Sequence, residues 1–204
     1  NAPIYNRKWI KKKPHKNTIE LKNLKKIKIE DALTKILSSP NHSNKTWVTN
    51  QYDQMVMCDT VQKSGSDAAI IRIHNKDKAI AVSVDSSANY CKSYPLTGGK
   101  QIVCENWRNL ITVGAKPLAI TNCLNFGNPE NQEVMGEFAE CLEGIKEACE
   151  FLNYPVVSGN VSFYNGTNKK NIYPTPVIGG VGLIKKLFKP LNHSFKEADS
   201  SLVL

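Results

Sequence analysis

Several signatures that would assign a nucleotide-binding or membrane protein at a glance are missing from this 204-residue sequence. No GxxxxGK[ST] stretch is present and no GxGxxG opens a helix, which excludes a Walker P-loop and a dinucleotide-binding βαβ fingerprint. No apolar run approaches the ~18 residues of a membrane span, and the lysine-rich start has no apolar signal segment. We therefore expect a cytoplasmic protein without a membrane partner, in which any nucleotide site is built another way.

Cysteine and histidine are too scattered to build a site of their own. The six cysteines form no CxxC motif and no Cys/His cluster, so neither a disulfide framework nor a zinc site is indicated. We expect six reduced thiols, most of them buried. The four histidines lie in polar connections, so no Ser-His-Asp or Cys-His set is suggested and a hydrolytic nucleophile is not expected.

The formal net charge of +9 belongs to the N-terminal part of the chain. Residues 1–45 hold 12 Lys and Arg against 3 Asp and Glu, whereas the other 159 residues hold 15 of each sign. Residues 1–28 have little periodicity and read as a linker arm, which leaves open a solvated tether or an attraction to phosphate or RNA. Because the interleaved aromatic side chains of an RNA platform are lacking, no nucleic-acid partner is expected.

Hydrophobic periodicity predicts a single main domain of α/β or α+β class, without internal repeats. Helical spacing of apolar residues indicates helices over 29–39, 43–56, 97–114 and 131–152. The last is the clearest amphipathic segment, and its apolar face comprises Val134, Phe138, Cys141, Leu142, Ile145, Cys149 and Leu152. Runs rich in β-branched residues indicate strands over 64–73, 78–85, 116–124, 154–162, 173–187 and 201–204, with a hairpin at 74–78.

Polar side chains collect in loops that follow predicted strands, where binding groups are commonly found. The loop NCLNFGNPE at 122–130 carries three amides, a glycine and a glutamate around one phenylalanine. Asparagine offers a neutral oxygen to a hard cation and an N–H group to phosphate or ribose, but it also forms Asx turns and helix caps. Both uses stay open here, as they do for Asp67 and Asp85, which could bind Mg²⁺ or cap a strand end.

The stretch VVSGNVSFYN raises the same question at the end of another predicted strand, taken to be buried. Gly159 allows another group to approach the backbone closely. The polar side chains of Asn160, Ser162 and Asn165 follow it and can point toward such a group. A phosphate is one group that this arrangement could accept.

Five stretches, in this order, resemble one known family: GSDAAIIRI, GGKQIVCENWRN, GAKPLAITNCLNFGNPE, VVSGNVSFYN and IYPTPVIGGVGLI. They are similar to the second half of phosphoribosylformylglycinamidine synthase, a family within the AIR synthase superfamily. The resemblance implies an α+β (α/β) fold of AIR-synthase N-terminal type, whose strands form half of a dimeric barrel with helices packed on one side. It also implies a linker arm at 1–28, an ATP-binding domain at 29–190 and the start of a C-terminal-type domain at 191–204.

The resemblance implies an ATP-dependent ligase of purine biosynthesis. The family converts formylglycinamide ribonucleotide (FGAR), ATP and glutamine-derived ammonia to formylglycinamidine ribonucleotide, ADP, phosphate and glutamate. An amide oxygen is a poor leaving group, so ATP phosphorylates it and ammonia then displaces phosphate. Such a step needs a metal and backbone donors more than it needs a nucleophile. The implied cofactors are ATP and Mg²⁺, and the implied partners are FGAR, the first half of the enzyme and a glutaminase domain or subunit.

Matching positions carry the family's binding roles onto this sequence. The SGNVS stretch implies that Gly159 contacts ATP, that Asn160 is a Mg²⁺ ligand and that Ser162 binds substrate. Where the family often has an aspartate as an ATP contact, this chain has Asn122, which carries no negative charge. After the VSVD strand relatives often read Asn-Gly-Arg-Tyr, whereas this chain reads Ser-Ala-Asn-Tyr around Asn89 and lacks the arginine.

The family's catalytic histidines and most of its Mg²⁺ carboxylates lie in the first half, so no catalytic residue is expected in this chain and the chain alone should be inert. A half with an exposed partner surface should form a homodimer in isolation. Three other functions stay open: another ATP-dependent enzyme of the AIR synthase superfamily, a scaffold half with vestigial loops, and a basic RNA-binding module.

Overall fold

The computed structural model describes residues 2–11, 13, 27–168, 170–187, 191, 197 and 199. Its helices are α1 (Ile29–Leu37), η2 (Pro40–His42), α2 (Thr46–Thr49), η3 (Val56–Cys58), α3 (Ala88–Ser93), α4 (Pro95–Thr112) and α5 (Gln132–Leu152). Its strands are β1 (Thr60–Gln62), β2 (Ala69–Arg72), β3 (Ala79–Asp85), β4 (Lys116–Asn125), β5 (Val156–Ser162), β6 (Gly166–Thr167), β7 (Lys170–Asn171) and β8 (Thr175–Ile184).

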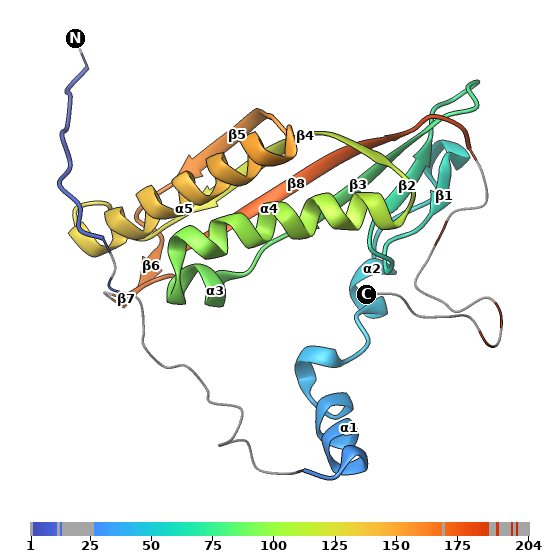
Figure 1. Cartoon of the computed structure of the whole chain (residues 1–204), viewed down its shortest axis with the longest axis horizontal. Coiled ribbons are helices and arrows are strands. Elements are labelled where there is room, and N and C mark those ends of the chain that lie inside the picture. Colours follow the sequence, from blue (N-terminus) through green and yellow to red (C-terminus); the bar gives the residue numbers. More distant parts are fainter. Residues whose placement is uncertain are drawn as a thin grey trace.

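Six of these strands form one mixed sheet in the order β1-β2-β3-β8-β4-β5, and β6 pairs with β7 separately. β4 and β5 run parallel, whereas the other neighbouring strands of the main sheet are antiparallel. The long helices α4 and α5 lie side by side across one face of the sheet (Figure 1). The fold is therefore mixed α and β with helices on one side, as the sequence predicts.

The hydrophobic core lies between these helices and the face of the sheet that they cover. Alternate residues of a strand point to opposite faces. The residues that point toward the helices include Ile70, Ala81, Ile120 and Ile178, each at most 1 % exposed. The opposite face is left open, since Val84 and Val181 remain 67 % and 39 % exposed. Only one face of the sheet is thus buried by the described residues.

A buried polar network fixes α4 on the covered face. The fully buried Asn106 side chain donates to the Asp85 carboxylate at 2.8 Å and accepts from the Tyr154 hydroxyl at 2.8 Å. A side chain at Gly180 would collide with both Asn106 and Tyr154, so the glycine makes room for the network. Burial raises the pKa of the Tyr154 phenol, which keeps it protonated as the donor at neutral pH.

Helix α5 confirms the predicted amphipathic segment. Asn131 caps its start, since its side-chain oxygen accepts from the Glu133 and Val134 amides at 2.9 and 3.3 Å. Asn153 ends it in a left-handed conformation with φ of 49°. Every residue of the predicted apolar face is buried or packs against the core.

Two helix predictions were wrong. The helix predicted over 43–56 shrinks to the four residues of α2 and buries none of its residues; the Asn44 side chain accepts from the Thr46 amide at 2.8 Å at its start. Without a packing surface, so short an apolar segment does not extend. Conversely, α3 occupies the predicted loop at 85–94, because Cys91 packs against α4 where Gly98 leaves room: a Cβ there would lie 2.7 Å from the Cys91 Cα.

The strand predictions were mostly confirmed. β2 and β3 form the predicted hairpin, with the Ile73 amide donating to the Lys78 carbonyl at 2.9 Å. β1 was not predicted, and β5 is an edge strand with Val157 71 % exposed rather than the buried strand expected. The strand predicted at 201–204 lies outside the described residues, as does the predicted boundary after 190.

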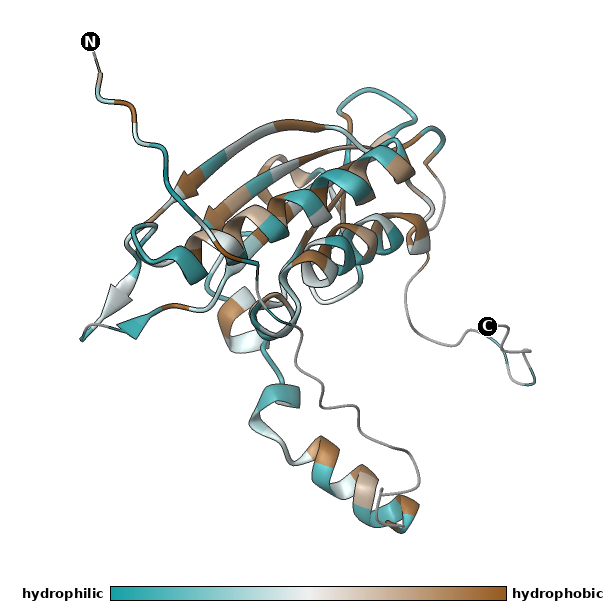
Figure 2. Cartoon of the chain, turned by 60° about the vertical axis from the view of Figure 1, so that its left-hand side comes forward, coloured by the Kyte–Doolittle hydropathy of each residue, from teal (hydrophilic) through white to brown (hydrophobic). Residues whose placement is uncertain are grey.

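The N-terminal helix α1 forms as predicted but buries none of its residues. Figure 2 shows it well away from the sheet, with apolar and polar residues both in view. No helix in the described part of the chain has the length and apolar character to cross a membrane.

Candidate nucleotide and metal site

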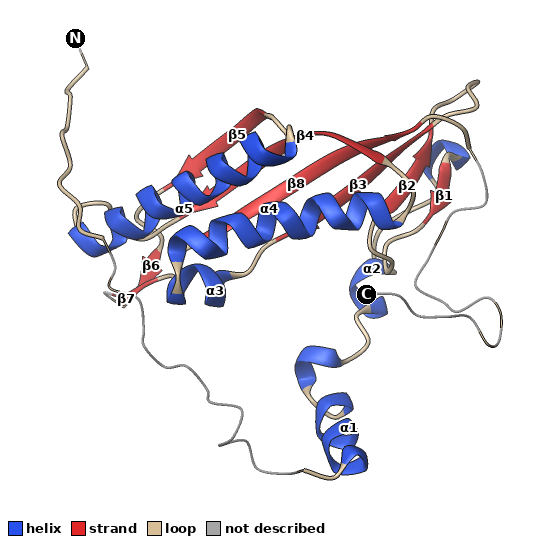
Figure 3. Ribbon diagram, in the orientation of Figure 1, coloured by secondary structure: helices blue, strands red, loops and turns tan. Residues whose placement is uncertain are grey.

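Two predicted site stretches become neighbours because β4 and β5 pair in parallel at one edge of the main sheet (Figure 3). The paired positions include Asn122 with Gly159, Cys123 with Asn160 and Asn125 with Ser162. Since the strands are parallel, the loops after them also meet, and the Phe126 amide donates to the Ser162 carbonyl at 2.9 Å. All four predicted site residues therefore lie within one short stretch of the paired strands.

Gly159 has no room for a side chain. A Cβ at this position would collide with the side-chain oxygen of Asn122 and would lie 2.9 Å from its backbone carbonyl oxygen, so the Asn122 side chain would have to move and the strands would have to shift slightly. The half-buried Asn122 amide thus occupies the space beside Gly159. The sequence assigns Gly159 to the close approach of a ligand. The structure adds a second reason for glycine, because the paired residue Asn122 leaves little space for a side chain.

The four predicted residues divide between the two faces of the sheet. Asn122 shares a face with the buried Ile120 and Leu124, so its side chain points to the helix side together with the Cα of Gly159. Asn160 and Ser162 alternate to the open face. The exposed Asn160 side chain makes no hydrogen bond to any other described residue, so its amide oxygen is available to a ligand approaching from that face.

Ser162 is held at the end of β5 by Asn165. The side-chain nitrogen of Asn165, Nδ2, lies 3.1 Å from Ser162 Oγ, 3.0 Å from the Ser162 carbonyl oxygen and 3.1 Å from the Phe126 carbonyl oxygen. The sequence identifies Asn165 only as a polar side chain that could face a ligand. In the structure its side chain instead bonds to neighbouring groups of the protein, and these bonds order the turn that contains Ser162.

Three aromatic rings pin the same two loops onto α5. Phe138 of α5 contacts Phe126 with ring centroids 5.1 Å apart and Phe163 with centroids 4.9 Å apart. Both contacts are edge-to-face, the arrangement that aromatic quadrupoles favour. The loops that follow β4 and β5 are therefore fixed to the helix as well as to each other.

The amides of the 122–130 loop serve partly as turn-forming groups. The Asn128 side-chain oxygen accepts from the Glu130 amide at 2.9 Å, which is an Asx turn. The Asn171 side chain accepts from the Asn128 amide at 2.9 Å and ties the loop to β7. The structural alternative thus holds for Asn128, whereas Asn122 is used neither in this turn nor in the cap of α5.

The two aspartates considered for Mg²⁺ have different surroundings. The Asp85 carboxylate accepts 2.8 Å hydrogen bonds from Ser83, Asn106 and Asn109, so its oxygens are engaged inside the protein. Asp67 differs in being exposed, in the turn before β2, but it lines the same surface hollow of about 560 Å³ as Asp85. The two carboxylates lie before β2 and at the end of β3, whereas Asn160 lies on the edge strand β5, so the three side chains do not come together.

A complete metal site is not assembled by the described residues, since no three of their His, Cys, Asp or Glu side chains gather where they could hold an ion. Asn160 is a single neutral donor, which suits one position in the oxygen shell of Mg²⁺. All six cysteines are free thiols, and the hydrogen bond with Cys91 together with burial raises the pKa of Cys141.

This fold and these motifs match one known domain. Residues 65–184 fit the family model described as AIR synthase related protein, N-terminal domain, which accounts for more than half of the chain. The chain belongs to this family.

Individual relatives carry more specific names. The phosphoribosylformylglycinamidine synthase subunit PurL of Pelagibacter ubique is 57 % identical over 205 residues, covering 100 % of this chain and 28 % of the relative. The subunit of the same name from Rhodopseudomonas palustris is 46 % identical with the same coverage. The chain therefore spans less than a third of these relatives.

Solved structures agree with these relatives. PurLQS from Thermotoga maritima superimposes with a TM-score of 0.70 at 33 % identity, over 90 % of this chain and 28 % of that one. Thermotoga maritima PurL complexed with ATP gives 0.65 at 32 % identity with the same coverage. The complex of PurL with FGAR gives 0.62 at 39 % identity, over 70 % of this chain and 23 % of that one.

Proposed function

We propose that this chain supplies part of the ATP, Mg²⁺ and substrate site of a phosphoribosylformylglycinamidine synthase. The longer polypeptide that would carry the chain is called the parent enzyme below. The parent enzyme would use ATP and glutamine-derived ammonia to convert FGAR to formylglycinamidine ribonucleotide. Similar proteins that span more than three times this length bear that name, and one of them has been seen with ATP and with FGAR.

The observation that carries the proposal is the residue-by-residue pairing of two motifs from distant parts of the sequence. ITNCLNFG on β4 and SGNVS on β5 align so that Asn122 meets Gly159 and Asn125 meets Ser162. The geometry supports a role for Gly159 as bare backbone on an edge strand, with the Asn122 side chain beside it. On the open face, it supports Asn160 as a neutral oxygen ligand and Ser162 as a hydrogen-bonding group for substrate.

These roles fit the chemistry of the proposed reaction. The γ-phosphoryl group of ATP is transferred to the amide oxygen of FGAR, and ammonia then displaces phosphate at the same carbon. Bound Mg²⁺ would neutralise charge on the phosphates during the transfer. The residues of this chain would orient the nucleotide and substrate, with Asn160 giving one oxygen to the metal and Ser162 fixing the substrate through a hydroxyl already ordered by Asn165.

This chain has Asn122 where the family often has an aspartate, and the neutral amide suits a hydrogen-bonding contact to ATP better than a charged one. Its amide can both donate and accept hydrogen bonds, and its side-chain oxygen already lies over Gly159. An aspartate there would add negative charge on the helix side of β4, beside Gly159. We therefore expect Asn122→Asp to keep the fold and to change the ATP concentration needed for half-maximal rate.

The proposal is tested by assaying the purified parent enzyme with FGAR, MgATP and ammonium chloride while ADP release is followed. Ammonium chloride replaces the glutaminase, so the assay does not depend on how ammonia is delivered. ADP release that requires FGAR and yields formylglycinamidine ribonucleotide would support the proposal. ADP release only with another acceptor would favour a different ATP-dependent enzyme of the superfamily.

The proposed assembly follows from the open face of the sheet. Ile71, Ile80, Val84 and Val181 leave between 37 % and 67 % of their surface exposed there, and contiguous exposed apolar surface favours association. In the parent enzyme this face would pack against the first half, and in the isolated chain against a second copy. Light scattering should report a dimer, and a strict monomer at high concentration would count against it.

A further inference from the structure

The N-terminal arm, residues 4–10, lies against the same loops that form the candidate site. The Ile10 amide donates to the Gln132 carbonyl at 3.3 Å at the start of α5. The Ile10 carbonyl approaches Gly136 so closely that a Cβ on Gly136 would collide with it. The bare backbone of Gly136 is thus what lets the arm settle on the helix.

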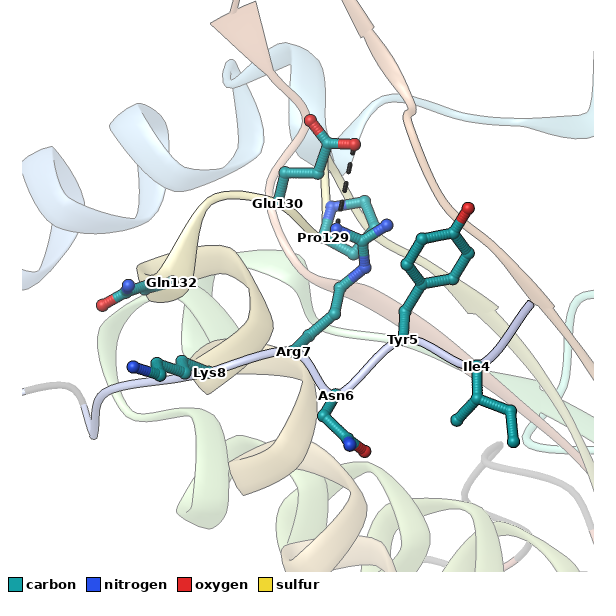
Figure 4. Close-up of a pocket in the computed structure, with 8 residues that line it drawn as sticks. All are labelled: Ile4, Tyr5, Asn6, Arg7, Lys8, Pro129, Glu130 and Gln132. Carbon is teal, nitrogen blue, oxygen red and sulfur yellow. Dashed lines mark ion pairs between the residues drawn. The ribbon is translucent and has the colours of Figure 1, made fainter.

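Arg7 forms a second attachment, farther along the arm. Its Nη2 donates to the Tyr164 hydroxyl at 3.3 Å, and its Nη1 lies 3.8 Å from the Glu130 carboxylate. The Tyr164 hydroxyl in turn donates to Glu130 at 3.3 Å, so the three side chains close a triangle. Figure 4 shows Arg7 reaching from the arm to Glu130, beside a hollow of about 430 Å³ that the arm encloses with the 129–132 segment.

The two partners of Arg7 belong to the two loops of the site. Glu130 follows β4, and Tyr164 follows β5 two residues after Ser162. Tyr164 also holds a left-handed φ of 60°, a conformation that non-glycine residues seldom adopt unless surrounding contacts hold them there. Its amide donates to the Gly127 carbonyl at 3.0 Å, and the next amide, of Asn165, donates to Phe126 at 3.2 Å.

We propose that Arg7 is a positioning residue that locks the Ser162 turn against the 126–131 loop, acting through Tyr164 and Glu130. The expected kinetic effect rests on the proposed function, whereas the contacts of Arg7 with Tyr164 and Glu130 do not depend on it. The Arg7 side chain is only 28 % exposed, yet Glu130 is 60 % exposed, and an ion pair so open to solvent adds little stability. Its effect is to fix geometry, because the guanidinium fork reaches two groups at once.

The test compares variants of the parent enzyme. Arg7→Ala should raise the KM for FGAR roughly fivefold while kcat and the KM for ATP stay within about twofold, because only the Ser162 turn is loosened. Arg7→Lys should recover part of the loss, because the lysine keeps the attraction to the Glu130 carboxylate. Gly136→Ala should reproduce the defect by displacing the arm, and Lys11→Ala, which removes an exposed arm charge, should behave as wild type.

A second readout is independent of activity. Hydrogen exchange at the Tyr164 and Asn165 backbone amides should be roughly threefold faster in Arg7→Ala and Gly136→Ala than in wild type and Lys11→Ala. Unchanged exchange in Arg7→Ala overturns the inference, and so does faster exchange with wild-type kinetics for FGAR. If the wild-type parent enzyme does not turn over FGAR, the proposed function fails. The exchange comparison alone then decides whether Arg7 holds the turn.

Discussion

The two faces of the main sheet differ in how far their side chains are buried. On the face covered by α4 and α5, Ile70 and Ile178 are fully buried, and the polar Asn106 is satisfied by hydrogen bonds. On the open face, Val84 is mostly exposed to solvent and Val181 is partly exposed. The covered face gives the domain its stability, whereas the open face presents Asn160 and Ser162 together with an apolar surface that the rest of a larger protein could cover.

The largest expected effect on activity comes from Gly159, which both packs against Asn122 and is assigned to contact ATP. Gly159→Val should cost about 1–3 kcal/mol in the free energy of unfolding, because its side chain must displace Asn122. In the parent enzyme it should also lower activity on the order of 100-fold at every Mg²⁺ concentration, since a steric block is indifferent to metal.

A companion variant separates packing from ligand approach. The double substitution Gly159→Ala with Asn122→Ala removes the colliding amide and should recover stability in urea denaturation. If its activity recovers fully as well, Gly159 is only a packing requirement and its assignment to ATP is lost.

The next effect contrasts the two faces directly. Ile178→Ala removes a fully buried side chain and should cost about 2–5 kcal/mol, whereas Val181→Ala on the open face should cost less than about 1 kcal/mol. Urea denaturation of the isolated chain measures both. This contrast applies at concentrations where the isolated chain is monomeric. At concentrations where the proposed dimer forms, the loss for Val181→Ala should grow with protein concentration, because a second copy then buries the open face.

The smallest effect is expected at the far edge of the sheet, where Asp59 pairs with Arg72. Hydrogen bonds from Arg72, the shorter at 2.8 Å, lower the pKa of the Asp59 carboxyl below 3.8 in the folded state. The pair therefore stabilises the fold fully above the ordinary pKa, and this contribution is lost as pH falls through the lowered value.

The measurement is the stability difference between wild type and Asp59→Asn across pH. The difference should be modest at neutral pH and should shrink as the solution is acidified below 3.8. A difference that grows on acidification would mean that the carboxylate is not stabilised by Arg72.

Much of the covered face could be predicted from the sequence. The apolar face of α5, the end of α4 just before Gly114 and the hairpin between β2 and β3 all follow from spacing and turn residues. These elements obey local rules because each buries one continuous face. The two polar stretches on β4 and β5 could also be located from their amides and glycines, while their ligand roles stay predictions.

The division of the site residues between two faces was not predictable. Opposite Ile120 and Thr121 of β4, the register of β5 shifts by one residue, from Val156 to Ser158. A single shift of this kind reverses which face each later side chain occupies, and nothing in the residue types signals it. The arm was missed for a related reason, because the contact of Ile10 with Gly136 depends on tertiary approach between distant segments.

The most direct test of the central claim is the Mg²⁺ dependence of the parent enzyme carrying Asn160→Ala, with Asn160→Asp as the matched control that keeps an oxygen ligand. Because the Asn160 side chain is exposed and bonded to no other described residue, its removal should leave the melting temperature unchanged. The account predicts that Asn160→Ala needs roughly tenfold more Mg²⁺ for half-maximal rate and that added Mg²⁺ restores part of the turnover. Wild-type Mg²⁺ and ATP dependence with a reduced melting temperature would contradict it and leave this domain a scaffold.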